Sequence, residues 1–289
     1  MNISEVTAVI CTLKEEYNIK DCVECIKENG VKKIILIDAS SRDKTVDIAR
    51  KLAVKCFVVP KKTIAFQRQY GVDVAKTKYV CFVDADNRLE KNCIVTLLKY
   101  INKTSFVGVA AQKIRLTSMN DYWSMGWDWH NRTTINTLGE KMVIGTPAMY
   151  LTDVLKKVRY ETELVSADDN VLCYKLSKLG YKVGTGPGVC YERMVASFDE
   201  FKRKLLGYGK GDAEFIIANP ERWYNMGTHA LRNYFLRGQW RALINGRFDL
   251  MPYYFFYGII RFYGMVKALF TLLILRKRSM VHPGYTKNY

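Results

Sequence analysis

The first 90 residues alternate short apolar runs with segments of helical spacing, and this alternation constrains the fold more than any other feature of the chain. The apolar, β-branched runs are VTAVICTL (6–13), KKIILIDAS (32–40), CFVVP (56–60) and YVCFVDAD (79–86). Strands that alternate with helices build a mostly parallel sheet, because each right-handed crossover packs its helix on a face of the sheet. The sequence therefore predicts an α/β, Rossmann-like fold.

The later part of the chain continues this pattern and then leaves it. Residues 105–116 predict another strand, and the tryptophan-rich stretch 118–135 predicts a loop or short helix over the ligand site. Residues 142–158 are expected to form a strand, a Gly-Thr-Pro turn and a helix, and 166–188 a helix with an acidic start and then a strand. From residue 197 the chain is basic and helical, which predicts a helical extension.

Acidic residues follow two of the predicted strands. Asp38 ends the second apolar run, and Asp84 and Asp86 end the fourth, on either side of the small residue Ala85. Open α/β sheets bind their ligands outside the carboxyl ends of the strands. Two carboxylates separated by one small residue can share a divalent cation that also bridges a diphosphate. A solvated acidic turn after a buried strand is the alternative interpretation.

Three segments resemble, in order and spacing, the signatures of the family 2 inverting glycosyltransferases. They are VICTLKEEYNI (9–19), IILIDASSRDKT (34–45) and QRQYGVDVAKTKYVCFVDADNRL (67–89). GTPAMYLTDVLKKV (145–158) is similar to the acceptor-side strand and turn of that family. SADDNVLCYKLSKLGYKV (166–183) resembles its acidic-dipeptide helix, with Asp-Asp where the family has Glu-Asp. The resemblance implies a GT-A catalytic domain over residues 1–200, followed by a helical, membrane-associating region over 201–289.

The resemblance implies a nucleotide-binding role for residues near the first strands. Asp38 would hydrogen-bond the base, with Thr12 and Glu15 flanking the nucleoside, and Arg68 would lie near the diphosphate. A surface position on a helix is the alternative for that arginine. The family often has a second acid where this chain has Ala39. This departure leaves the base open: the resemblance favours a UDP-sugar as the donor, and a GDP-sugar is the alternative.

The resemblance also implies a metal site and a general base. Asp84 would contact the ribose or the metal, and Asp86 would bind Mn²⁺ or Mg²⁺. Asp169 would take the proton of the attacking acceptor hydroxyl, as inversion requires a base on the sugar face opposite the leaving nucleotide. Asp168 beside it would raise the pKa of that base by its like charge. Capping of the helix N-terminus is the alternative role for the acidic pair.

The acceptor side is expected to involve Trp127, Asp128, His130 and Thr146. The tryptophans of this stretch offer faces on which a sugar can stack, whereas core or lid packing is the alternative. The acceptor is predicted to be a lipid-linked or saccharide hydroxyl. A polyprenyl phosphate is the alternative acceptor, because such a phosphate is already anionic and needs cations rather than a base.

Composition separates the C-terminal region from the rest of the chain. Residues 201–289 contain 15 Lys/Arg against 4 Asp/Glu and 19 of the 37 aromatic residues. Within them, MPYYFFYGIIRFYGMVKALFTLLILRKR (251–278) is apolar, is interrupted by Arg261 and Lys267, and ends on a basic cluster. This pattern predicts a monotopic protein on the cytoplasmic face of an anionic membrane. Helices packed on the catalytic domain or on a second subunit, or a tilted spanning element, are the alternatives.

Other classes of protein fit the sequence less well. The N-terminus MNISEVTAVI lacks the basic and apolar regions of a secretory signal. The eight cysteines lie mostly in apolar runs and predict buried thiols in a reducing compartment, and Cys22 and Cys25 have no second pair for a zinc site.

Three rival functions are also disfavoured. The first loop lacks the glycine-rich phosphate loop of a nucleotidyltransferase. The net charge of +17 admits a basic membrane- or nucleic-acid-binding protein, but no nucleic-acid-binding motif is present and no nucleic-acid partner is expected. The intact acidic motifs disfavour an inactive scaffold.

Overall fold

The computed structural model of the chain describes residues 2–60, 63–116 and 121–274. The chain divides into two compact units. The sheet unit comprises Met1–Ser118, Asp128–Glu163 and Asp168–Met194, and the helical unit comprises Met119–Trp127, Leu164–Ala167 and Val195–Tyr289. Two short internal segments thus belong to the unit that is otherwise C-terminal. The predicted division at residue 200 between catalytic and membrane-associating regions concerns function and stays a prediction.

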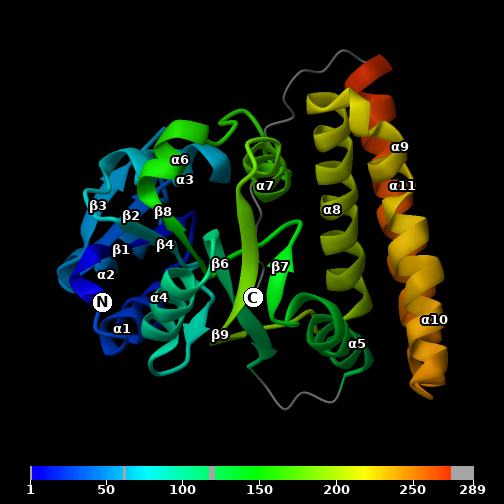
Figure 1. The fold of residues 1–289 in the computed structure, drawn as a ribbon, viewed down its shortest axis with the longest axis horizontal. Coiled ribbons are helices and arrows are strands. Elements are labelled where there is room, and N and C mark those ends of the chain that lie inside the picture. Colours follow the sequence, from blue (N-terminus) through cyan, green and yellow to red (C-terminus); the bar gives the residue numbers. More distant parts are fainter. Residues whose placement is uncertain (1, 61–62, 117–120, 275–289) are drawn as a thin grey trace. The chain divides into compact units, whose positions relative to one another are not determined.

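A nine-stranded sheet, counted over the described residues, forms the centre of the sheet unit (Figure 1). Its strands are β1 Val6–Thr12, β2 Lys33–Asp38, β3 Lys55–Val58, β4 Tyr79–Phe82, β5 Arg88–Leu89, β6 Phe106–Arg115, β7 Gly139–Lys141, β8 Ala148–Leu151 and β9 Lys182–Glu192. Their order is β3-β2-β1-β4-β8-β6-β9-β5, and β7 also pairs with β9. Strands β1 to β4 pair in parallel, as do β6 and β9, whereas β5, β7 and β8 run antiparallel to their neighbours. The α/β prediction is confirmed.

Helices cover both faces of the sheet, and two hydrophobic clusters fill the space beneath them. The helices are α1 Ile19–Glu28, α2 Thr45–Lys51, α3 Ile64–Val74, α4 Cys93–Lys103, α6 Thr152–Val158 and α7 Asp168–Lys178, with short helical turns η1 Ile3–Glu5 and η2 Asn131–Ile135. Alternate residues of β1 point to opposite faces. Ile10 therefore packs with α1, α2 and α4 in one cluster, and Val9 packs with α3, α6 and α7 in the other.

Helix α3 lies very close to β1 because Gly71 has no side chain. A Cβ at this position would stand 2.5 Å from Cγ1 of Val9, much nearer than two carbon atoms can pack. The close approach fixes α3 against the sheet and brings Gln67 and Arg68 of the same helix to the carboxyl end of the parallel strands.

The predicted strand at the start of 142–158 is wrong. Residues 142–147 form no strand, and Met142 is 80% exposed, so its apolar side chain does not enter the sheet. The strand lies after the Gly-Thr-Pro turn instead: β8 pairs antiparallel with both β4 and β6, and its residues Ala148, Met149 and Tyr150 are buried. Helix α6 follows as predicted.

The helical unit is built around two long helices, α8 Phe198–Ala218 and α11 Met251–Ile274. Shorter elements join them: η3 Pro220–Arg222, α9 Trp223–Gly227, η4 Ala230–Leu236, α10 Arg237–Ile244 and η5 Phe248–Leu250. Helix α5 Tyr122–His130 crosses the boundary, because the unit includes its residues up to Trp127. The backbones of α8 and α11 approach closely at Gly209, where a Cβ would stand 2.3 Å from the carbonyl oxygen of Arg261.

One helix in the described part of the chain, Phe248–Leu273, is long and apolar enough to cross a membrane by length and composition. Its most apolar 18-residue window has a mean hydropathy of 1.3, and 28% of that window is buried within the structure. The basic cluster Arg276, Lys277 and Arg278, on which the sequence prediction partly depends, lies outside the described residues.

Candidate active site

The ends of β1 and β2 form one side of the candidate site. The Asp38 carboxylate is fully buried, and it accepts hydrogen bonds from Thr12 Oγ1 at 2.8 Å, from Ser41 Oγ at 2.6 Å and from the Ser41 amide at 2.7 Å. Gln67 Nε2 of α3 donates to the carbonyl oxygens of Thr12 and Ile37 at 2.9 and 2.7 Å. The structure thus brings Asp38 and Thr12 together, as the predicted nucleoside site requires.

Glu15 lies in the loop that leaves β1. Its amide donates to Thr45 Oγ1 at 2.8 Å, and its carboxylate accepts from Asn18 Nδ2 at 2.9 Å. These bonds attach the loop to the start of α2 and to the residue before α1. Glu15 therefore helps to shape the loop beside the strand ends, and its contact with a nucleoside stays a prediction.

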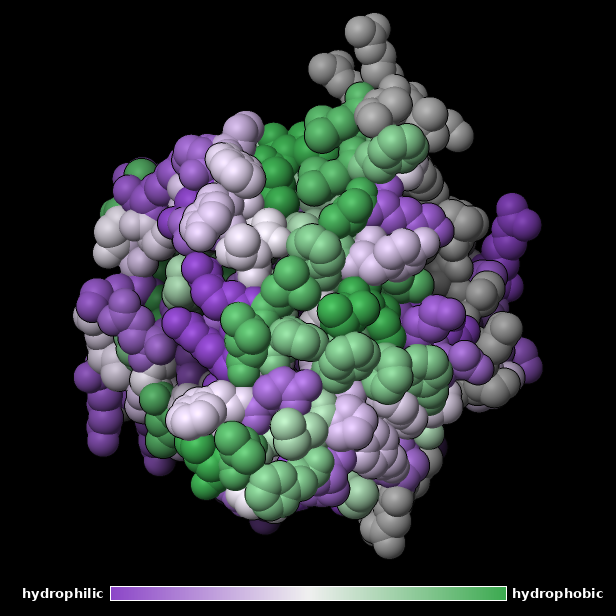
Figure 2. Space-filling view, turned by 90° about the vertical axis from the view of Figure 1, so that its right-hand side faces the viewer, coloured by the Kyte–Doolittle hydropathy of each residue, from purple (hydrophilic) through white to green (hydrophobic). Residues whose placement is uncertain are grey.

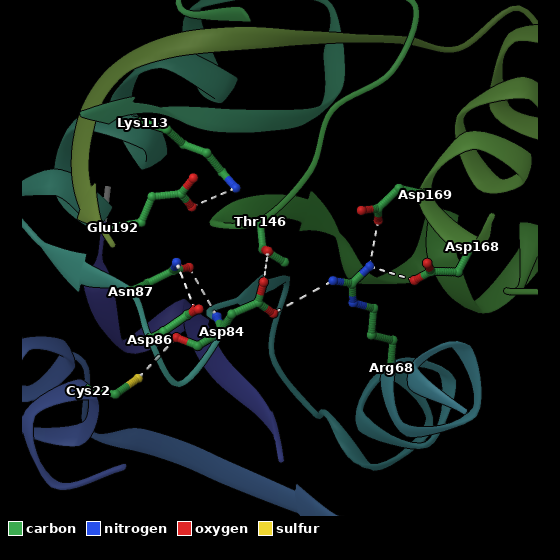
Figure 3. A network of polar contacts seen from close by, with 10 residues as sticks. All are labelled: Cys22, Arg68, Asp84, Asp86, Asn87, Lys113, Thr146, Asp168, Asp169 and Glu192. Atoms are coloured by element: carbon green, nitrogen blue, oxygen red, sulfur yellow. Dashed lines mark hydrogen bonds and ion pairs between the residues drawn. The ribbon is translucent and has the colours of Figure 1, made fainter. Parts of the chain in front are cut away.

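Asp84 and Asp86 occupy a tight turn after β4 (Figure 3). Asn87 closes this turn: its amide donates to the Asp84 carbonyl at 2.9 Å, and its side-chain oxygen accepts from the Asp84 amide at 3.1 Å. The Cys22 thiol of α1 lies 3.5 Å from the same carbonyl. Thr146 Oγ1 donates to the Asp84 carboxylate. The turn is therefore held from both sides, with its two carboxylates at the carboxyl end of the sheet.

A single buried guanidinium connects this turn to the acidic start of α7. Arg68 Nη1 lies 2.6 Å from Asp168 Oδ2 and 2.6 Å from Asp169 Oδ1, and Nη2 lies 3.7 Å from Asp84 Oδ1 (Figure 3). The arginine side chain is only 6% exposed. Both members of the acidic pair thus turn toward Arg68, and the surface alternative for this arginine does not apply.

Burial and like charges shift the proton affinities of this cluster. Burial raises the pKa of Asp169 to about 7, and the negative charges of Asp168 and Asp84 add to the rise, whereas Arg68 opposes it. Burial lowers the pKa of Arg68, but the negative charges of the three carboxylates raise it by more and hold it well above its ordinary value. The Asp169 side chain is 29% exposed and that of Asp168 is 9% exposed. Asp169 is therefore the member of the pair that a substrate can reach.

Replacing Arg68 by methionine is expected to lower the free energy of unfolding at pH 7 by about 3–5 kcal/mol, because it leaves buried carboxylates without their counter-charge. The loss should be smaller at pH 5, where Asp169, whose pKa burial raises to about 7, is protonated and no longer needs a counter-charge. Denaturant titration of the wild type and the variant at both pH values measures it.

A matched control is Arg159→Met. Arg159 makes a two-point ion pair with Asp73 at 3.0 and 2.9 Å, but both side chains are well exposed, so its loss should change stability by at most about 1 kcal/mol. Equal stability of the two variants would show that Arg68 is not the counter-charge of the acidic cluster.

The structure adds a charged pair that the sequence analysis did not identify. Lys113 of β6 lies 2.9 Å from Glu192 at the end of β9, and Figure 3 shows the pair on the other side of Asp84 from Arg68. Asn136 holds the backbone of Lys113 through two hydrogen bonds of 2.8 Å. The lysine charge also lowers the pKa of Asp169. No local motif marks this pair, because its members are brought together only by the β6–β9 pairing.

The residues predicted for the acceptor lie in different surroundings. Trp127 is buried in the helical unit, where its ring stacks on that of Tyr257 with 5.8 Å between the ring centroids. This is core packing, the alternative to stacking on a sugar. In the sheet unit, Asp128 pairs with Arg132 at 2.7 Å, and His130 is buried. Thr146 is the member of the set that lies at the carboxylate cluster, through Asp84. Contact of these residues with an acceptor stays a prediction.

Comparison with known protein families gives a match over the N-terminal half of the chain. The model of the family described as Glycosyl transferase family 2 matches residues 7–159. An uncharacterized glycosyltransferase of Rickettsia bellii is 23% identical over 246 residues, which are 81% of this chain and 79% of that protein. One of Rickettsia conorii is 29% identical over 246 residues, 81% of this chain and 82% of that protein.

Solved structures share the fold over most of the chain. A mannosyltransferase from Pyrobaculum calidifontis, in complex with GDP-Man and Mn²⁺, superposes with a TM-score of 0.66 at 15% identity, over 92% of this chain and 87% of the other. TarS residues 1–349 of S. aureus, in complex with UDP-GlcNAc, superpose with a TM-score of 0.53 at 12% identity, over 92% and 90%. The fold is therefore GT-A, as the sequence resemblance implies.

Proposed function

Since this chain belongs to glycosyl transferase family 2 and is a glycosyltransferase, we propose that it transfers a sugar, with inversion, from a nucleotide sugar to a hydroxyl of a lipid-linked or saccharide acceptor. A divalent cation assists the transfer, and Asp169 is the general base. The observation that carries the proposal is the ion-pair cluster at Arg68, which joins the Asp84 turn to Asp169.

The donor is a nucleotide sugar, with UDP favoured over GDP. Asp38 and Thr12 lie at the strand ends where α/β sheets bind nucleotides, and Gln67 links them to α3, which carries Arg68. Two proteins of this fold, solved with GDP-Man and with UDP-GlcNAc, support a nucleotide-sugar donor without deciding the base. The preference for UDP depends on the sequence resemblance alone.

The chemistry of the donor set fits a divalent cation at Asp86 and Asp84. Among the described residues no group of three or more His, Cys, Asp or Glu side chains could hold a metal ion. Two neighbouring carboxylates suit Mn²⁺ or Mg²⁺, which takes its other ligands from substrate phosphates and water. Asp84 accepts from Thr146 and Asp86 accepts from Asn87 Nδ2 at 3.5 Å; following the resemblance, Asp86 is the first ligand in this proposal and Asp84 the second. When bound, the cation offsets the negative charge that develops on the leaving diphosphate.

In the transfer step, Asp169 takes the proton of the acceptor hydroxyl while the acceptor oxygen bonds to the anomeric carbon. The bond from that carbon to the nucleoside diphosphate breaks at the same time, so Asp169 ends protonated and the diphosphate leaves as an anion. A base with a pKa of about 7 is well matched to this proton transfer near neutral pH. Gly145 lies beside Asp169: an added Cβ there would touch Oδ2 at 3.5 Å, so the lack of a side chain leaves that oxygen uncovered on this side.

A hydroxyl acceptor is better supported than a lipid phosphate. A phosphate acceptor needs unneutralised cations, whereas Arg68 is surrounded by three carboxylates and Lys113 is paired with Glu192. The apolar helix Phe248–Leu273 supports an acceptor at a membrane surface, and we propose a peripheral enzyme on the cytoplasmic face.

The first experiment measures donor binding. Calorimetric titration of the full chain with UDP- and GDP-sugars, with Mn²⁺ and then with EDTA, should show one nucleotide class that binds tightly only when metal is present. The selected donor is then offered to saccharides and to lipid extracts, and product is followed by mass spectrometry. Binding of no nucleotide sugar, with or without metal, would overturn the proposed donor. Transfer only to a phosphate would replace the hydroxyl acceptor.

A further inference from the structure

The helical unit exposes a continuous set of large apolar side chains on η4, α10, η5 and α11. We call this set the apolar face; its members are Leu236, Trp240, Leu243, Ile244, Phe248, Phe255, Phe256, Ile259, Tyr263, Val266, Phe270 and Leu273. Each of them is at least 38% exposed. Figure 2 shows apolar side chains gathered in a broad band on the face that carries the C-terminal helices. Contiguous exposed apolar surface of this extent marks an interaction site.

Helix α11 has two distinct sides. At 100° per residue, its exposed members from Phe255 to Leu273 fall within one arc of about 100° of the helix circumference. The opposite side packs within the unit: Tyr253 contacts Phe201 of α8 at 5.1 Å between ring centroids, and Gly264 lies against Leu206. One side of α11 is therefore committed to protein contacts, and the other is available to a partner.

Arg261 interrupts the apolar sequence, but its charge is neutralised by an ion pair inside the helical unit. Its Nε and Nη2 lie 2.7 Å from the two carboxylate oxygens of Asp212 on α8, and Nη1 donates to Tyr234 Oη at 3.0 Å. Asp212 is fully buried. The arginine thus belongs to the packed side of α11 and adds no charge to the apolar face.

The charges around the apolar face are nearly all positive. Apart from the buried Arg261, residues 222–274 include six basic residues and a single acid, Asp249, which pairs with Arg247 at 2.7 Å. Arg237 and Arg241 lie on α10 itself, and the exposed Lys267 lies beside the arc of α11. A basic rim around an aromatic and aliphatic surface complements anionic lipid headgroups, because the cations meet the phosphates while the rings enter the acyl boundary.

We propose that the apolar face inserts into one leaflet of an anionic bilayer and that α11 lies along the membrane rather than crossing it. The proposal identifies an anionic membrane as the partner of the enzyme, and it rests on the proposed function. A helix that crosses the bilayer alone is surrounded by lipid, whereas α8 packs along one side of α11. Helix α8 has eight charged residues, and the hydrocarbon core does not accept that number of charges.

Vesicle binding tests the partner without donor or turnover. The full chain should float with vesicles of phosphatidylglycerol and phosphatidylcholine (3:7) and bind phosphatidylcholine vesicles at least tenfold more weakly. Trp240→Ser combined with Phe270→Ser should lower the partition constant at least tenfold, and Leu138→Ser, at an exposed apolar residue of the sheet unit, should not. Donor binding should be unchanged in all three proteins, so a failed membrane result leaves the proposed reaction intact.

Depth measurements test the orientation. Tryptophan is introduced by Ile259→Trp, Val266→Trp or Phe270→Trp. At each position its fluorescence should be quenched more by lipids brominated near the headgroup than by lipids brominated near the methyl end, and to the same degree at all three positions. Deep quenching of Ile259→Trp, which lies near the middle of Phe248–Leu273, with progressively shallower values at Val266→Trp and Phe270→Trp, would show a spanning helix and overturn the proposal. Self-association without vesicles, abolished by the Trp240/Phe270 substitutions, would assign the face to a second copy of the chain instead.

Discussion

Replacing Asp169 by asparagine is expected to lower kcat by about 10²–10⁴-fold while the donor still binds within about threefold of wild type, which is the loss typical of a missing general base. Asparagine keeps the shape and the contact with Arg68 but cannot accept the hydroxyl proton. Steady-state transfer assays, with donor affinity measured separately, check both parts.

The pH profile gives a second readout of the same prediction. Asp169 acts as a base only when deprotonated, so transfer by the wild type should be lost as the pH falls through about 7 and level off above it. Asp168→Asn removes a like charge that raises the pKa of Asp169, so its profile should shift to lower pH. A large kcat loss in Asp168→Asn, with an active Asp169→Asn, would assign the base to Asp168.

Replacing Asp86 by alanine is expected to lower transfer by about 10³-fold and to abolish the dependence of donor binding on Mn²⁺. The magnitude follows from the several kcal/mol that a cation at a leaving diphosphate contributes. Titration of Mn²⁺ into the protein with and without nucleoside diphosphate, followed by electron paramagnetic resonance, reports metal binding independently of activity.

The control for this substitution is Asp47→Ala. Asp47 is an acid of α2 that is 71% exposed and pairs loosely with Arg50 at 3.7 Å, so its loss should leave metal and donor binding unchanged. If Asp86→Ala binds Mn²⁺ and donor as the wild type does, the tight turn after β4 is not the metal site.

Local sequence patterns predict the parallel half of the sheet because each of its strands is a compact apolar run. The same patterns place Asp38 and Asp84 at strand ends, since the topological rule for ligands in such sheets needs only the order of elements. They fail at 142–151, where two apolar stretches flank one turn. Met142 and Val143 are exposed, whereas Ala148 and Tyr150 are buried by β4 and β6, which are distant in sequence.

The contacts that assemble the site are beyond local patterns for the same reason. Arg68 and Asp168 are 100 residues apart, and their ion pair depends on the packing of α3 and α7 on one face of the sheet. Lys113 and Glu192 meet only because β6 pairs with β9. Helix α4 was not predicted either, although its apolar side fills the core with Ile94 and Leu97.

Asp84 and Asp169 share Arg68 as their counter-ion, so a change of charge at one of them changes the proton affinity of the other. Asp84 and Asp169 compete for the same guanidinium, and each raises the energy of the other's negative charge. Positive charge that arrives at Asp84 therefore favours the ionised form of Asp169, and by reciprocity an ionised Asp169 strengthens the hold on that charge. If the proposed cation binds at Asp84, its arrival would therefore increase the fraction of Asp169 that is deprotonated, which is the form that the proposed transfer needs.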